Sequence, residues 1–297
     1  MTASTLSAGI PAIFVTADCL PEAWEKAILA VWDHGLEIKT QYDKSQDPPS
    51  KDATVMITIT NPLAEPRIHK NFPGGPAELE AYRQEVVSGI HDHWIDPVSG
   101  KWTYTYHERL FAYCPVEDIR NPDSPKPFRK VNQIQYIIDK LAQTAHTRRA
   151  QAITWMPTAD PQTDDPPCLQ RIWCRLVSND DGELSLDMNT HWRSRDLYKA
   201  WFMNVYAVTD LQRIITDQIS NKINRPVKVG RYVDISDSLH IYGSYFDEAA
   251  KEVRKMRKSP FIDRAWQTNH PAFEMMTAEA RENLAKDPDF YAKPKGS

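Results

Sequence analysis

Residues 196–220, DLYKAWFMNVYAVTDLQRIITDQIS, form the longest helical pattern in the chain. Apolar side chains occupy much of the circumference of this predicted helix, which is typical of a helix enclosed by other elements on most sides. We therefore expect this segment to lie at the centre of the fold, with the remaining helices and strands arranged around it.

Shorter helical patterns and strand patterns lie on both sides of this segment along the chain. Helical spacing occurs at residues 20–36, in the second half of 64–94, at 131–143, at 246–258 and at 271–285. Alternating or β-branched runs predict strands at residues 53–62, 101–113, 148–157, 169–177 and 183–194, and a pair of strands at 229–246. Because these elements do not follow regular strand–helix–strand units, we predict an α+β fold with one large sheet.

The composition limits the class of protein. The 297 residues are 41% hydrophobic and 26% charged with a net charge of -4, which is ordinary for a globular protein and lacks the basic excess of a nucleic-acid surface. The sequence has neither the apolar run of about 18 residues that crosses a membrane nor a signal peptide. Its four cysteines show no disulfide framework and no metal-ligand spacing. We expect a cytoplasmic protein that uses no metal, membrane or nucleic acid.

Cys168 follows two prolines and is a candidate nucleophile. Taken alone, such a cysteine is equally well explained as a small buried apolar residue. Arg148 and Arg149 stand at the start of a predicted strand, however, and residues 193–195 read Arg-Ser-Arg. Guanidinium groups pair bidentately with phosphate oxygens, so these clusters favour the binding of a phosphomonoester near the thiol.

Six short motifs occur in an order that resembles a known family. They are Thr147-Arg148-Arg149, Ala152-Ile153-Thr154-Trp155, Pro166-Pro167-Cys168, Arg193-Ser194-x-Asp196, Phe202-x-Asn204 and His240-Ile241-Tyr242. Their order and spacing resemble thymidylate synthase over roughly residues 50–245. The resemblance implies that family's fold, a large mixed sheet packed with helices, and a sheet-to-sheet homodimer. We therefore expect one domain over residues 1–297, with an N-terminal helix at 20–36, a core at about 50–245 and a C-terminal helical extension at about 246–297.

The resemblance implies a role for each matched residue. Cys168 resembles the nucleophile whose thiolate adds to C6 of a pyrimidine nucleoside monophosphate, so that C5 takes a one-carbon unit from 5,10-methylenetetrahydrofolate. Arg193 and Ser194 resemble the phosphate contacts and the means of lowering the thiol pKa. Arg148 and Arg149 resemble the arginines that reach the phosphate from the neighbouring subunit of the homodimer.

Other matched residues resemble contacts to the folate, the base and the sugar. Asp196 resembles the carboxylate that holds the pterin of the folate. Asn204 resembles the amide that reads the pyrimidine edge, and it favours uracil without excluding cytosine because a flipped amide exchanges donor and acceptor. His240 and Tyr242 resemble the pair that hydrogen-bonds the sugar hydroxyl. The choice between ribose and deoxyribose stays open.

Two residues are matched by their position alone. Glu65 is our candidate for the glutamate that manages protons at the 4-position of the base through water. The alternative interpretation of Glu65 is a capping or surface carboxylate. Lys51 stands where the family has an arginine on a mobile phosphate-binding loop, although a lysine lacks the bidentate fork.

Three departures from the family pattern concern the second half of the reaction. His91 aligns with a tryptophan that helps to exclude water beside the folate, and Trp94 matches a second tryptophan. Leu169 follows the nucleophile where many members have histidine. The C-terminal sequence DPDFYAKPKGS, at 287–297, replaces the apolar end of the family.

These departures bear on the fate of the carbon carried to C5, because hydride transfer and hydration compete for the same intermediate. Hydration makes a 5-hydroxymethyl nucleotide, and hydride transfer makes a methyl group. We predict a hydroxymethylase that acts on CMP, dCMP or dUMP. The alternative is a thymidylate synthase that converts dUMP to dTMP and releases dihydrofolate. A more remote alternative is a catalytically silent relative that only binds nucleotides.

Overall fold

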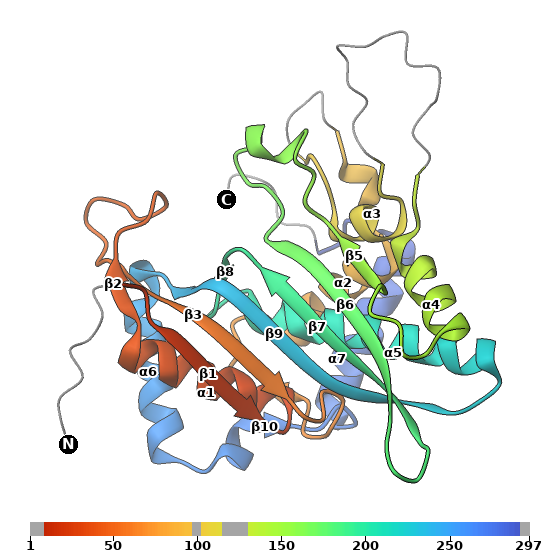
Figure 1. The fold of residues 1–297 in the computed structure, drawn as a ribbon. Coiled ribbons are helices and arrows are strands. Elements are labelled where there is room, and N and C mark those ends of the chain that lie inside the picture. The colour runs from red at the N-terminus through yellow and green to blue at the C-terminus, as the bar shows by residue number, and fades with distance from the viewer. Residues whose placement is uncertain (1–8, 97–101, 115–129, 292–297) are drawn as a thin grey trace, which may run out of the picture.

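A computed structural model of the chain describes residues 9–96, 102–114 and 130–291. One mixed sheet dominates it, with the strand order β1-β3-β9-β7-β6-β5, while β2 pairs with β3 and β8 with β9 (Figure 1). The strands are Ala12–Ala17 (β1), Leu36–Ile38 (β2), Ser50–Ile59 (β3), Gln151–Ile153 (β5), Leu169–Ser178 (β6), Leu184–Trp192 (β7), Arg195–Asp196 (β8) and Val227–Ile241 (β9). Two short strands, Ile68–His69 (β4) and Ala265–Trp266 (β10), form a separate ribbon.

The helices gather on one side of this sheet, behind it in the view of Figure 1. They are Leu20–His34 (α1), Pro76–Ser88 (α2), Tyr106–Phe111 (α3), Gln133–Gln143 (α4), Trp201–Ile223 (α5), Phe246–Lys258 (α6) and Pro271–Lys286 (α7), with 3-10 turns at Asp92–Trp94 (η1), Asp160–Gln162 (η2), Gly243–Tyr245 (η3) and Phe261–Arg264 (η4). The α+β class with one large mixed sheet is confirmed. None of the helices that the structure describes is long and apolar enough to cross a membrane.

Helix α5 has the central place that its pattern predicts. Its residues Val205, Leu211 and Ile215 have no exposed surface. It packs against α2 and also contacts strand β9 and helices α1 and α4. Helix α7, in the predicted C-terminal extension, packs against α2 on the same side of the sheet. Helices α5 and α2 therefore lie between the sheet and helix α7.

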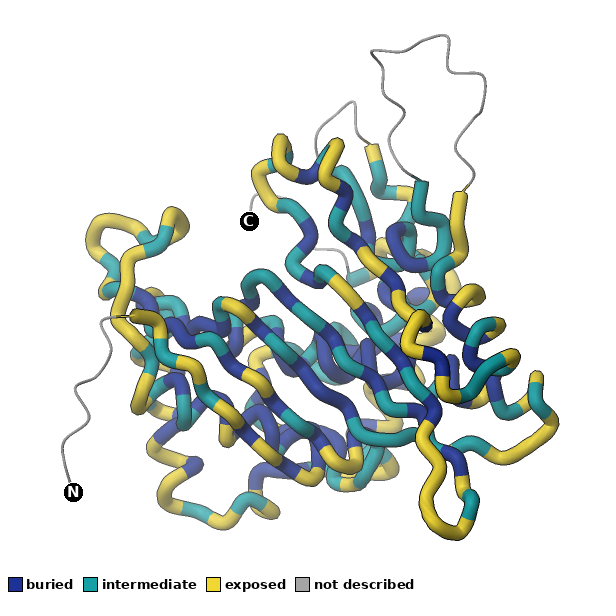
Figure 2. The backbone as a smooth tube through the Cα atoms, viewed as in Figure 1, coloured by how far each residue is buried: buried dark blue, intermediate teal, exposed yellow. Residues whose placement is uncertain are grey.

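None of the described helices lies over the opposite face of the sheet (Figure 1 and Figure 2). Residues on this face form a row across six strands, in which neighbours are register partners: Phe14, Met56, Ile235, His191, Arg171 and Ile153. Phe14 is 61% exposed and Met56 is 42% exposed. Val15 and Ile57, one position further along, point to the helical side and are buried. An uncovered sheet face that exposes several large apolar side chains beside polar ones is typical of a protein–protein interface.

Two predicted elements differ from the structure. The segment 101–113 was predicted as a strand from its alternation, but residues 106–111 form helix α3. Thr105 caps this helix, because its hydroxyl accepts a hydrogen bond from the Glu108 amide at 3.0 Å. This Thr-x-x-Glu spacing is a helix-start signal that outweighs the alternating aromatics before it.

The predicted strand pair at 229–246 is one long strand, β9, that ends at Ile241. A register shift opposite Ala53 and Val55 accommodates an extra residue without turning the chain back. Strand β1 was not predicted; it pairs in parallel with β3 at the edge of the sheet.

Candidate active site

Cys168 is half-buried and directly precedes β6. The register of β6 and β7 pairs Leu169 with Trp192, and this brings the residue after β7, Arg193, beside the cysteine. The Arg193 amide donates to the Cys168 carbonyl at 2.9 Å, and the Arg193 Nε donates to the Pro167 carbonyl at 3.1 Å. The sheet therefore brings together the thiol and one arginine that the sequence predicts to act with it.

The surroundings of Cys168 oppose ionisation of its thiol. Burial raises the pKa of Cys168; Arg193 and Arg195 lower it in part, and Asp165 raises it further. The net result is a pKa above the usual value. Because the thiolate is the nucleophile, the thiol needs a base or a bound substrate to take or displace its proton.

His240, Tyr242 and Asp196 come together at the ends of β8 and β9. Asp196 and His240 are register partners, and the rings of His240 and Tyr242 lie 4.5 Å apart. Burial lowers the pKa of His240 to about 4 and raises the pKa of Asp196 to about 6. At neutral pH His240 is therefore an uncharged imidazole.

Asn204, on α5, contacts a residue that the sequence did not single out for the site. Its Nδ2 donates to the hydroxyl of Tyr82 on α2 at 2.6 Å. Burial raises the pKa of Tyr82 well above its usual value, so this hydroxyl stays protonated. With one Nδ2 hydrogen engaged by Tyr82, Asn204 keeps its Oδ1 as an acceptor and its second Nδ2 hydrogen as a donor for other partners.

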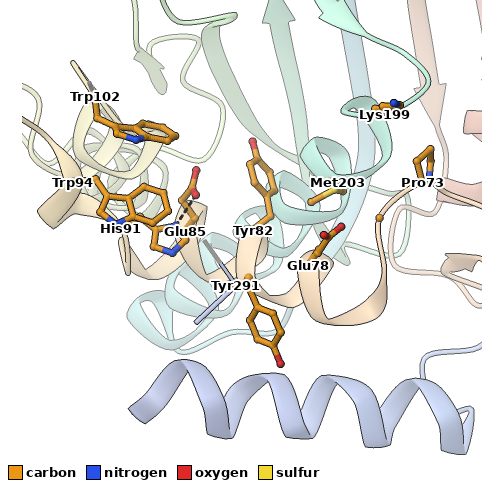
Figure 3. A pocket seen from close by; sticks show the side chains of 12 residues that line it. Pro73, Glu78, Tyr82, Glu85, His91, Trp94, Trp102, Lys199, Met203 and Tyr291 are labelled. Carbon is orange, nitrogen blue, oxygen red and sulfur yellow. Dashed lines mark hydrogen bonds and ion pairs between the residues drawn. The ribbon is translucent and has the colours of Figure 1, made fainter. Parts of the chain in front are cut away.

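A cavity of about 370 Å³ lies between α2, α5 and the turn η1 (Figure 3). Helix α2 lines it with Glu78, Tyr82 and Glu85, which share one helical face because they are spaced at i, i+4 and i+7. The other lining residues include Pro73, His91, Trp94, Trp102, Lys199, Met203 and Tyr291. Figure 3 shows the indoles and His91 at one end of the cavity and Lys199 at the other.

His91 is held on both of its ring nitrogens. Nδ1 lies 2.7 Å from Glu85 Oε2, and Nε2 lies 3.0 Å from the carbonyl oxygen of Pro288. The ring stacks on Trp94 with the centroids 3.7 Å apart and the planes at 8°. Burial lowers the pKa of His91, but the hydrogen bonds to Glu85 and to the Pro288 carbonyl, with the nearby negative charges, raise it above its usual value overall.

The segment after α7 reaches the same turn. Asp289 Oδ1 accepts a hydrogen bond from Trp94 Nε1 at 2.7 Å and lies 2.9 Å from His93 Nε2. Together with the Pro288 carbonyl, these contacts join the described end of the chain to η1. The rest of the predicted C-terminal segment, residues 292–297, lies outside the described residues.

Glu65 is not among the residues that line this cavity. It is exposed, its Oε2 accepts from the amides of Arg67 and Thr268, and its Oε1 accepts from the Thr268 hydroxyl. The turn that carries Glu65 precedes β4, whereas the carboxylates that reach the cavity, Glu78 and Glu85, come from α2. The exposure and the contacts of Glu65 therefore fit the alternative interpretation, a carboxylate at the surface.

Lys51 lies within β3 and not on a loop, because it pairs with Glu37 on β2 and with Ile241 on β9. Its Nζ is 3.5 Å from Glu37 Oε1 and 5.6 Å from the centroid of the Trp32 ring. The expected loop position is therefore wrong. The segment between β2 and β3 is the loop at this point of the chain.

The remaining predicted residues lie at the surface or the edge of the site. Arg148 and Arg149 are exposed and precede the edge strand β5. Ser194 is half-buried between β7 and β8. Across the described part of the chain, no three His, Cys, Asp or Glu side chains are grouped so that they hold a metal ion.

The residues missed by sequence reasoning are Glu78, Tyr82 and Glu85 on α2. Helical spacing of 78, 82 and 85 was a usable signal, since it places two carboxylates and a phenol on one face of a predicted helix. The spacing did not indicate which residues lie opposite this face of the helix, because they come from distant parts of the chain.

The fold and the site define the class of protein, an α+β enzyme. Its candidate site has a cysteine beside Arg193 at the end of a strand, and a separate cavity walled by aromatic side chains. A family model described as thymidylate synthase matches residues 81–282, which is more than half of the chain. The protein belongs to the thymidylate synthase family, and its activity is of the one-carbon-transfer type.

Relatives and solved structures agree with this assignment. A protein of Methanococcoides burtonii described as "putative thymidylate synthase" is 27% identical over 240 residues, covering 81% of this chain and 94% of the relative. One of Methanosarcina barkeri with the same description is 29% identical over 233 residues, covering 78% and 91%. The structure of thermostable thymidylate synthase A from Bacillus subtilis matches with a TM-score of 0.55 at 17% identity, covering 80% of this chain and 84% of that one, and supports the fold.

Proposed function

We propose that this protein transfers a one-carbon unit from 5,10-methylenetetrahydrofolate to C5 of a pyrimidine nucleoside monophosphate and hydrates it to a 5-hydroxymethyl group. The observation that carries the hydration step is the Glu85–His91 pair in the cavity wall, with Nδ1 to Oε2 at 2.7 Å. A carboxylate-oriented imidazole beside the reacting carbon is suited to position and deprotonate water.

The nucleotide is bound around Cys168. Arg193 and Ser194 hold the phosphate, His240 and Tyr242 hold the sugar, and Asn204 reads the base. Addition of the Cys168 thiolate to C6 makes C5 nucleophilic. The methylene carbon bridges two folate nitrogens, so both of its C–N bonds must break: one opens as C5 bonds to the carbon, and loss of the C5 proton then expels the second nitrogen and leaves an exocyclic methylene on the ring.

The folate supplies the carbon at the oxidation level of formaldehyde, and the described residues fit such a group. The ring faces of His91, Trp94 and Trp102 at one end of the cavity suit a flat aromatic molecule. Asp196 provides a carboxylate for pterin N–H donors. Water adds to the methylene carbon, its proton passes to His91, and departure of the Cys168 sulfur from C6 completes the turnover.

Glu78 is our candidate for the proton-handling glutamate, in place of Glu65. It shares its helical face with Tyr82, whose hydroxyl contacts the base-reading Asn204. Glu65, by contrast, is engaged by Thr268. A carboxylate next to the base-reading amide is suited to exchange protons with the 4-position through water.

The contact between Pro288 and His91 limits when hydration occurs. With Nε2 directed at the Pro288 carbonyl, the imidazole has no free nitrogen to act as a base. In the proposed reaction a water takes the place of that carbonyl. Nδ1 then stays with Glu85 and Nε2 faces the methylene carbon.

The same contact favours the second candidate function, reductive methylation of dUMP by a thymidylate synthase. If residues 288 and 289 stay over His91 and Trp94 during turnover, they exclude water from the methylene carbon. Hydride from the folate then reduces that carbon, and dihydrofolate is released.

Product analysis separates the candidates. The protein is incubated with 5,10-methylenetetrahydrofolate and each of dUMP, dCMP, UMP and CMP, and the nucleotide product is weighed by mass spectrometry. A gain of CH2O with tetrahydrofolate supports the hydroxymethylase. A gain of CH2 with dihydrofolate contradicts it and supports the synthase, and no product from any nucleotide favours the silent relative.

We also propose a homodimer that uses the uncovered face of the sheet. The row from Phe14 to Ile153 runs across six strands without helices over it, and several of its apolar side chains are exposed. Arg148 and Arg149 stand exposed beside the edge strand, where they can extend to the phosphate in a partner's site.

Subunit complementation tests this arrangement. Cys168→Ser and the double variant Arg148→Ala/Arg149→Ala are each expected to be inactive. Random exchange of their subunits makes half of the dimers mixed, each with one intact site, so about a quarter of wild-type activity returns. No recovery on mixing, or full activity of the double variant alone, contradicts the shared site.

A further inference from the structure

Two buried acceptor atoms near the end of the sheet have no hydrogen-bond partner among the described residues. They are Nε2 of His240 and Oδ1 of Asp52. His240 is 5% exposed and Asp52 is 7% exposed. Most buried polar groups in folded proteins are hydrogen-bonded, and an unpaired one costs free energy. A pair of such atoms therefore points to a ligand that completes them.

The two residues are direct neighbours across the sheet. Asp52 on β3 and His240 on β9 are register partners in an antiparallel pair, so their side chains emerge on the same face. In such a pair the Cβ atoms lie about 5 Å apart. Asp196 on β8 continues the same row on the other side of His240. The unpaired atoms thus belong to one small region beside residues proposed to hold the sugar.

Ser238 determines which His240 nitrogen carries a proton. Its hydroxyl donates to Asp52 Oδ2 at 2.8 Å, and its oxygen lies 3.3 Å from His240 Nδ1. Because a serine has one hydroxyl hydrogen, which goes to the carboxylate, its oxygen must accept from Nδ1–H. A neutral His240 then has a lone pair on Nε2. Both unpaired atoms are therefore acceptors, and the missing ligand must offer two donors.

Two adjacent hydroxyl groups meet this requirement. Ribose carries 2′- and 3′-hydroxyls on neighbouring carbons, whereas deoxyribose has only the 3′-hydroxyl. We propose that the substrate is a ribonucleoside monophosphate, with His240 Nε2 and Asp52 Oδ1 each accepting a hydrogen bond from one hydroxyl of the diol. This inference rests on the proposed function and specifies its sugar. Asp52 is then a specificity-determining residue, and Ser238 is a positioning residue.

Calorimetric titration of the full-length protein with CMP, dCMP, UMP and dUMP, without folate, tests the sugar directly. A deoxynucleotide leaves Asp52 Oδ1 buried and unpaired, so each ribonucleotide is expected to bind about 10- to 100-fold more tightly than its deoxy counterpart. Binding without turnover keeps this measurement independent of the fate of the carbon at C5.

Variants at Asp52 locate the selectivity. Asp52→Ala removes the acceptor and is expected to bring the ribose-to-deoxyribose affinity ratio to about 1. Asp52→Asn retains the size of the side chain but only a neutral acceptor, and is expected to reduce the ratio part-way. Asp180→Asn, in the exposed turn between β6 and β7, is the matched control and should keep the wild-type ratio. Thermal melting verifies that each variant is folded.

The outcomes distinguish this inference from the function on which it rests. Equal affinity for ribo- and deoxynucleotides in the wild-type protein overturns the ribose assignment and leaves the one-carbon transfer standing. Ribose selectivity that survives in folded Asp52→Ala overturns the role of Asp52. Failure of all four nucleotides to bind overturns the proposed function and the sugar assignment together.

Discussion

The proposed nucleotide side and the proposed folate side of the site are built in different ways. On the nucleotide side, strand register places Cys168 beside Arg193 and Asp52 beside His240. On the folate side, a helix, a 3-10 turn and the described end of the chain meet through side-chain contacts. One of these contacts joins His91 to the carbonyl of a residue 197 positions away in the sequence.

This difference bears on how far each side can depart from the family pattern. A shift of register would move every side chain of a strand to the other face, so Arg193 and His240 keep their motif positions, and the departures within strands are the single substitutions Leu169 and Lys51. Residues on the folate side have fewer such constraints. His91 and the segment at 287–291 occupy that side, and in the proposed function they govern access of water to the carbon at C5.

Cys168→Ser gives the largest expected effect and tests the nucleotide side alone. A serine hydroxyl is a much weaker nucleophile at neutral pH, so turnover should fall by about a thousandfold or more while nucleotide binding is retained. The rate of tritium release from C5-labelled nucleotide measures this step. Cys114→Ser, also a half-exposed cysteine, is the matched control and should keep near-wild-type rates. Turnover by Cys168→Ser at a similar rate would remove the covalent mechanism.

His91→Phe tests the folate side alone. The phenyl ring keeps the stacking on Trp94 but has no nitrogen for Glu85 or water, so the ratio of hydroxymethyl to methyl product should fall by about tenfold or more. Tritium release from C5 should continue, because it precedes the partition. Glu85→Gln should act in the same direction with a smaller effect. Loss of tritium release in His91→Phe would mean that the two sides are not separate.

Tyr82→Phe tests the helix that links the two sides. Removing the hydroxyl leaves Asn204 Nδ2 without its partner at 2.6 Å, so nucleotide affinity should fall by about 5- to 10-fold. The orientation of the Asn204 amide also becomes less restricted, so the ratio of the affinities for UMP and CMP should move closer to 1. Titration with both nucleotides measures both effects. An unchanged preference would show that Tyr82 does not orient Asn204.

The pH dependence of the C-terminal contact gives the smallest expected effect. The pKa of His91 is raised in the folded protein, so its stabilisation is fully present below its ordinary value of about 6.5 and is lost as the pH rises through the raised value. Hydrogen-exchange protection of residues 287–291, corrected for intrinsic rates, should therefore fall a few-fold between about pH 6 and pH 9.

Two variants separate His91 from its neighbours in this pH experiment. His91→Gln should abolish the pH dependence, whereas His93→Gln, which removes only the exposed partner of Asp289, should keep it. A pH dependence that persists in His91→Gln would mean that His91 is not its source.

Much of the fold was predictable because its signals are local. The apolar circumference of residues 201–219 indicated a central helix, and Gly35 correctly marked the end of α1 at His34. The strands at 169–178 and 184–192 follow from alternation. The errors arose where two local signals competed, as at 101–113, where the Thr105 cap outweighed an alternating run.

The site was predictable in part for a related reason. The motifs around Cys168, Arg193, Asn204 and His240 are recognisable as short strings of residues. Glu65 was selected by its distance along the chain from those motifs, and such a distance does not reveal that Thr268 engages it. Strand pairing places Lys51 within β3, which its position in the sequence did not indicate.

The sequence by itself determined the family, the candidate nucleophile and the central helix, because motif order and hydrophobic periodicity are properties of neighbouring residues. Only the tertiary structure decided the partners of those residues. It paired His91 with Glu85 and Pro288, and it set the unpaired atoms of Asp52 and His240 side by side. These contacts join residues far apart in the chain, and they form only when the sheet register and the helix packing are complete.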